Sequence, residues 1–146
     1  MSERREGAGE RIIQAAWASV GVLAAATVPE ALGLDAWEPI GVAVSLGLFL
    51  ASIPVWIYAF GLAVVRSGNG DDIVVSSLFF LTGSAPKRVR RHLLGATAAS
   101  VVVAAAVAFA EPFAVLAPML PIGLTGLWGA RHGTFPPRKR QGKRVG

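Results

Sequence analysis

The chain has 146 residues, of which 53% are hydrophobic and only 16% are charged, and its mean hydropathy is +0.56. Soluble domains carry about 25% charged residues, so this chain has too few charges to cover a surface that faces water. The composition excludes a soluble enzyme and a disordered chain, and the absence of cysteine excludes disulfides and thiolate metal sites. It predicts one all-α integral membrane domain over residues 1–146.

Runs without formal charge locate the expected membrane spans. Four such runs of 18, 27, 19 and 19 residues lie between Arg11 and Arg131. A helix needs about 20 apolar residues to cross a hydrocarbon core of ~30 Å. We therefore expect four transmembrane helices in two hairpins, at about 12–29, 40–65, 92–110 and 112–130. The first run is alternatively a cleavable signal peptide, because basic residues precede it and small alanines end it.

The distribution of basic residues predicts the orientation of these spans. All 14 Lys and Arg residues fall in the N-terminal segment, the loop between spans two and three, or the C-terminal segment. The two remaining loops carry acidic residues only. Because Lys and Arg concentrate in cytoplasmic loops, both termini are expected to be cytoplasmic. This pattern explains the high isoelectric point without nucleic acid, which we do not expect as a partner.

The loop over residues 66–91 is too long for a simple turn. Asn69 to Asp72 resembles a helix start with acidic caps, and an apolar stretch of nine residues follows, from Ile73 to Leu81. Nine residues cannot cross a membrane. We expect a short interfacial helix in this cytoplasmic loop, with a buried loop element of the bundle as the alternative.

Two groups of cations are the candidate contacts for anionic lipid headgroups or for a partner. One group immediately precedes the third span, and the other lies in the tail at 131–146, which we expect to be basic, cytoplasmic and disordered. The candidate residues are Lys87, Arg88, Arg90, Arg91, Arg138, Lys139 and Arg140.

Small residues at helical spacing predict faces for helix contact, since membrane helices associate by close packing. These faces are Ala43, Gly47 and Ala51 in the second span, Gly95 with Ala99 and Ala96 with Ser100 in the third, and Gly123, Gly126 and Gly129 in the fourth. Pro54, Pro118 and Pro121 are expected to kink their spans.

The expected spans contain no Asp, Glu, Lys or Arg, although such groups serve proton-coupled transporters. The sequence also lacks a nucleophile with its base and any cluster of metal ligands, so we expect no enzyme activity, no cofactor and no metal. The leading hypothesis is a non-catalytic accessory, scaffolding or assembly subunit that contacts the bilayer and other membrane proteins or itself. A small oligomeric transporter or channel is the alternative. A third hypothesis is a lipid-modifying enzyme that uses Asp72 and His92 of the middle loop.

Two stretches resemble a known group of proteins: GDDIVVSSLFFLTGSAPKRVRRHLLGA at 70–96 and GLWGARHGTFPPR at 126–138. They are similar to small four-helix integral membrane proteins of high-GC Gram-positive, actinobacterial-type bacteria. The resemblance implies a multi-pass protein of the bacterial plasma membrane. It implies no activity, because no function is attached to that group.

Overall fold

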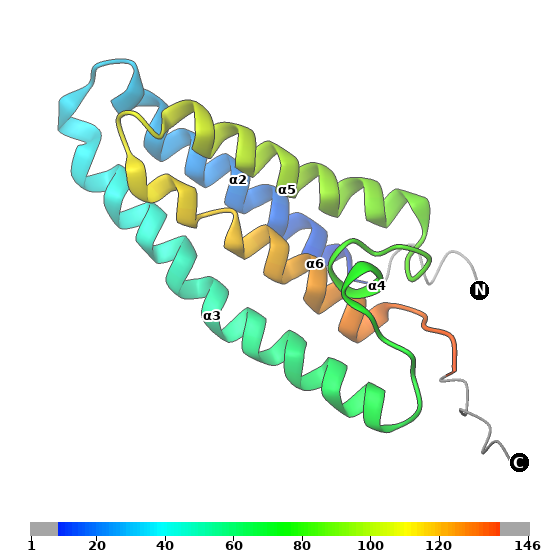
Figure 1. The fold of residues 1–146 in the computed structure, drawn as a ribbon. Helices are drawn as coiled ribbons and strands as arrows, with labels where there is room; N and C mark the ends of the chain where they lie inside the picture. The colour runs from blue at the N-terminus through cyan, green and yellow to red at the C-terminus, as the bar shows by residue number, and fades with distance from the viewer. Residues whose placement is uncertain (1–8, 138–146) are drawn as a thin grey trace, which may run out of the picture.

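A computed structural model describes residues 9–137, which fold into a bundle of four long helical segments (Figure 1). The elements in chain order are α2 (Glu10–Ala31), η1 (Asp35–Trp37), α3 (Glu38–Gly68), α4 (Val75–Phe79), α5 (Lys87–Val107), η2 (Pro112–Leu116) and α6 (Met119–His132). The α elements are α-helices and the η elements are 3₁₀ helices. The expected all-α class is confirmed over these residues, whose only β contact is an isolated bridge between Asp71 and Pro137.

Three segments of the described chain are long and apolar enough to cross a membrane: Glu10–Ala31, Asp35–Gly68 and Pro112–His132. They match the first, second and fourth expected spans and support a multi-pass membrane protein. The third expected span corresponds to α5, which is 21 residues long but is not among these segments. Four of its first five residues are cations, and they lower its mean hydropathy.

The fourth expected span is not one helix, because two prolines interrupt it. Pro118 and Pro121 have no N–H group to donate to the carbonyls four residues earlier, those of Ala114 and Ala117. These carbonyls accept instead from the N–H groups of Ala117 and Leu120, each at 3.1 Å, with the shorter spacing of a 3₁₀ helix. The segment therefore divides into η2 and α6. Pro54, by contrast, lies within the continuous helix α3.

Helix α5 packs along α2, and α3 packs along α6, as Figure 1 shows. Most of the predicted small-residue faces are used within this bundle. On α5, Ala96 and Ser100 are buried. On α6, a Cβ atom added at Gly123 would meet Trp56, and one at Gly126 would meet Phe79. These close approaches require glycine.

The middle loop differs from its expected form. Its helix, α4, is only five residues long, and its N-terminus is capped by the Ser77 hydroxyl, which accepts from the N–H of Val74 at 3.1 Å. The expected acidic start at Asn69 to Asp72 is wrong, because Asp71 instead forms an ion pair with Arg66 at 2.8 Å. Helix α4 packs against α6, as the alternative of a buried loop element predicts. Its position relative to a membrane interface stays a prediction.

Arg66 joins the end of α3 to the end of α6. Its guanidinium donates to the carbonyl oxygens of Ala130 at 3.2 Å and Gly133 at 2.7 Å, and it lies 4.7 Å from the ring centre of Phe135. The segment after α6 is also bonded to the middle loop, since the N–H of Asp72 donates to the Pro136 carbonyl at 2.8 Å. The tail expected from 131 thus begins inside α6 and continues as a bonded segment to 137. Residues 138–146 lie outside the described residues.

Candidate functional sites at the two ends of the bundle

The charged residues of the described chain gather at opposite ends of the bundle. At one end, which we call the basic end, α2 and α5 begin and α3 and α6 finish. Its cations are Arg11, Arg66, Lys87, Arg88, Arg90, Arg91 and Arg131, with Glu10, Asp71 and Asp72 among them. The opposite acidic end carries Glu30, Asp35, Glu38 and Glu111 and no cation.

The four predicted contact residues that precede the third span lie together in the first turns of α5. Lys87, Arg88, Arg90 and Arg91 are all exposed. Arg88 pairs with Glu10 at the start of α2, at 3.4 Å, and the Nε of Arg90 donates to the Phe80 carbonyl at 3.0 Å. The exposed group can meet lipid headgroups at the basic end. The other predicted contacts, Arg138, Lys139 and Arg140, lie outside the described residues.

Two further cations line a depression at the basic end, and the sequence did not predict that they lie together. Arg11 of α2 and Arg131 of α6 line a depression of about 440 Å³ together with His132. They are far apart in the sequence, so only the packing of the first helix against the last brings them together. Their charge makes the depression a candidate contact for an anionic headgroup.

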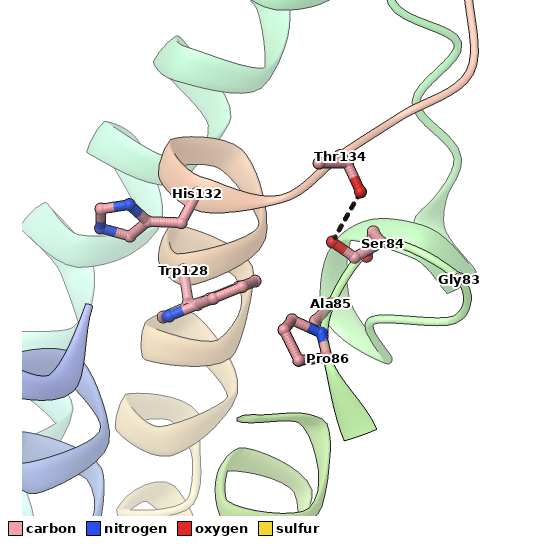
Figure 2. A pocket seen from close by; sticks show the side chains of 7 residues that line it. All are labelled: Gly83, Ser84, Ala85, Pro86, Trp128, His132 and Thr134. Atoms are coloured by element: carbon pink, nitrogen blue, oxygen red, sulfur yellow. Dashed lines mark hydrogen bonds between the residues drawn. The ribbon is translucent and has the colours of Figure 1, made fainter. Parts of the chain in front are cut away.

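A smaller pocket of about 250 Å³ lies between the loop before α5 and the end of α6 (Figure 2). Its lining residues are Gly83, Ser84, Ala85, Pro86, Trp128, His132 and Thr134. Ser84 is buried, and its hydroxyl donates to the Ser77 carbonyl, while its own carbonyl accepts from the Thr134 N–H at 2.9 Å. These bonds close the loop against the segment after α6.

The lining of this pocket does not form a nucleophile with a base. Figure 2 shows the imidazole ring of His132 directed away from Ser84, on the other side of the end of α6. The ring lies instead beside Trp128, with ring centres 5.7 Å apart. No group of three His, Cys, Asp or Glu side chains that could hold a metal ion occurs within residues 9–137.

The acidic end contains the least expected feature, two buried carboxyl groups. Glu30 is 8% exposed and Glu111 is 1% exposed. Glu30 lies in the last turn of α2, just beyond the expected span 12–29, which itself contains no acid. Helix α2 continues past the end of the uncharged run, and the Glu30 side chain is buried within the bundle. The charge pattern predicts both residues in loops.

The two carboxyl groups meet against α3 at Gly41. The Oε1 atom of Glu111 accepts from the Phe113 N–H at 3.0 Å and so caps η2. A Cβ atom added at Gly41 would lie 2.5 Å from Oε2 of Glu30 and 3.4 Å from Oε2 of Glu111. Oε2 of Glu30 is buried without a hydrogen-bond partner. The absence of a side chain at Gly41 provides the space that both oxygens face.

Comparisons of the chain with protein-family models, with curated proteins and with solved structures gave no match. The function is therefore argued from the two ends of the bundle and from its outer faces.

Proposed function

We propose that this chain is a non-catalytic integral membrane protein that serves as an accessory, scaffolding or assembly subunit of a larger membrane complex. In this proposal it crosses a bacterial plasma membrane four times, with both termini in the cytoplasm and the basic end against anionic lipids. The acidic end then faces the opposite side.

The observation that carries the subunit role is the open face of α3. Only 17% of its most apolar stretch is buried, against 39% for α2 and 61% for the segment that ends with α6. The small-residue face predicted around Gly47 is not filled by any of the described residues, since a Cβ atom added there would have no neighbour within 4 Å. The small-residue faces predicted on α5 and α6 are packed against other residues of the bundle. Lipid can cover an apolar surface, but an unfilled row of small residues favours a second helix.

The charge distribution supports the proposed topology. If α5 crosses the membrane beside α2, every cation of the described residues lies on one side, as the positive-inside pattern requires. The cations that lower the hydropathy of α5 all lie in its first turns, where they can reach the headgroups while the rest of the helix is in hydrocarbon.

The test is purification of the protein from its native membranes after mild cross-linking, followed by mass spectrometry of the retained proteins. We expect one stoichiometric membrane partner. A bulky side chain in the small-residue face, Gly47→Ile, should reduce its recovery at least tenfold. Gly21→Ile is the matched control, because Gly21 is an exposed glycine of α2 that also has no neighbour within 4 Å. Self-cross-links alone, or equal loss in both variants, would contradict the subunit role.

A small oligomeric transporter or channel is the second candidate function, and the buried acids favour it. Ionisable groups within membrane segments are costly and commonly lie on ion pathways. The broken segment of η2 and α6, with Glu111 at its start, is the kind of discontinuous helix that borders transport sites. A flux of a cation through liposomes that hold the purified protein would support this function over the subunit role.

A further inference from the structure

We propose that Glu30 and Glu111 bind one small cation, a proton or an ion of about the size of sodium, at the acidic end of the bundle. This inference goes beyond the subunit role and does not depend on it, since either an accessory subunit or a transporter can hold such a site.

The chemistry of the two carboxyl groups favours a cation between them. Ionised carboxylates only accept hydrogen bonds, so two of them can contact each other only through a proton or another cation. The carboxyl group of Glu30 lies against that of Glu111, and the free Oε2 of Glu30 has no donor from the protein. Two buried negative charges without a counterion would be strongly destabilising. A bound cation removes this penalty.

Among the described residues, no cation at this end can neutralise the pair. The charged groups that act on Glu30 are Glu111, Glu38 and Asp35, which are all acidic. Glu38 and Asp35 are exposed at the start of α3 and in η1. They make the surroundings more negative, and so attract a cation towards the pair.

Oxygen atoms from several elements lie around Gly41. The main-chain oxygen of Ala26 lies 3.5 Å from the position of a Cβ atom at Gly41, on the same side as the two Oε2 atoms. Ser45 follows Gly41 by one turn of α3 and is fully buried, and its hydroxyl oxygen has no hydrogen-bond partner. Side chains in a helix lean towards its N-terminus, so the Ser45 hydroxyl leans towards the level of Gly41. Ser45 thus adds a second unpartnered buried oxygen, one turn along α3 from Gly41.

The test follows thermal unfolding of the full chain in uncharged detergent micelles by the fluorescence of its four tryptophans. One series raises the pH in choline chloride without sodium. The other replaces choline chloride by sodium chloride at constant pH and ionic strength. A cation held only by the folded chain stabilises it, so the unfolding temperature should shift by about 5 °C for each tenfold change in free cation above the dissociation constant. A proton gives a fall with rising pH, and a sodium-sized ion gives a rise with sodium.

Two variants remove the site while conserving its shape, Glu30→Gln and Glu111→Gln. Each should abolish the shift, and the amide oxygen of Gln at 111 can still accept from the Phe113 N–H. The exposed acids provide the controls: Asp35→Asn and Glu38→Gln should retain the shift.

A second pair of variants tests the geometry without changing a charge. Gly41→Ala places a Cβ atom only 2.5 Å from Oε2 of Glu30, so this oxygen must move and the shift should be abolished, whereas Gly47→Ala on the same helix should keep it. Should the Gln variants fail to fold, infrared spectra of the unmodified chain across both series will report the band of a protonated carboxyl group or a cation-dependent carboxylate band. An unmodified chain that responds to neither cation, or a response that persists in both Gln variants, would overturn the proposal.

Discussion

The glycines of α6 show how single residues determine the packing of this fold. The sequence predicted a contact face at Gly123, Gly126 and Gly129, and the structure fills each position with an aromatic ring or a main-chain group. The spacing predicted the face but could not name its occupant. For Gly126 and Gly129 the occupant is the middle loop rather than another long helix.

We predict that Gly129→Ala lowers the free energy of unfolding by about 1–3 kcal/mol, as overpacking of a filled site does. The new Cβ atom would lie 2.7 Å from the Leu78 carbonyl oxygen, and this main-chain atom can move only if α4 moves with it. The measurement is unfolding by sodium dodecyl sulfate in mixed micelles. Gly61→Ala is the control, because Gly61 on α3 has open space and should gain about 0.5–1 kcal/mol. Equal effects of the two substitutions would contradict this packing.

The contact between the two buried acids could not be predicted from the sequence. Glu30 and Glu111 lie in different hairpins, each at the edge of an uncharged run, which is where loop residues are expected. No local pattern shows that α2 extends two residues beyond the expected end at 29, or that Gly41 leaves space for a carboxyl group. Only the packing of α2, α3 and η2 places the two side chains together.

At the scale of elements, length and composition predicted the long helices well, and local signals predicted the loops poorly. The expected bounds 12–29 and 40–65 lie within α2 and α3. The break between η2 and α6 also follows from the sequence, since the prolines that produce it were expected to disturb that span. The acidic start expected for the loop helix was wrong because Arg66 holds Asp71 in an ion pair, a contact set by tertiary structure.

Two neighbouring phenylalanines of the middle loop allow the docking of α4 on the bundle to be tested. Phe79 is partly buried and stacks on Trp56, with ring centres 4.8 Å apart, whereas Phe80 is 55% exposed. We expect Phe79→Ala to lower the free energy of unfolding by about 2–4 kcal/mol and to speed proteolysis of the middle loop. Phe80→Ala should change it by less than about 0.5 kcal/mol. If the two variants unfold and are cleaved alike, α4 does not dock in this way.

At the scale of the whole molecule, the described chain is a bundle with one basic end and one acidic end. Three of its helical segments can cross a membrane by length and composition. The proposed topology requires that α5 also crosses the membrane. If α5 crosses the membrane, both short connections, near Leu34 and Phe109, lie on the side of the membrane opposite to the middle loop.

The most direct test of this claim is the accessibility of single cysteines to a membrane-impermeant maleimide in intact cells. The chain has no cysteine, so each variant carries one thiol. The substitutions are Leu34→Cys, Phe109→Cys and Thr82→Cys, at positions that are all exposed. If α5 crosses the membrane, the first two are labelled in intact cells, and Thr82→Cys is labelled only after the membrane is permeabilised. Labelling of Phe109→Cys on the same side as Thr82→Cys would show that α5 does not cross the membrane, and would contradict the account.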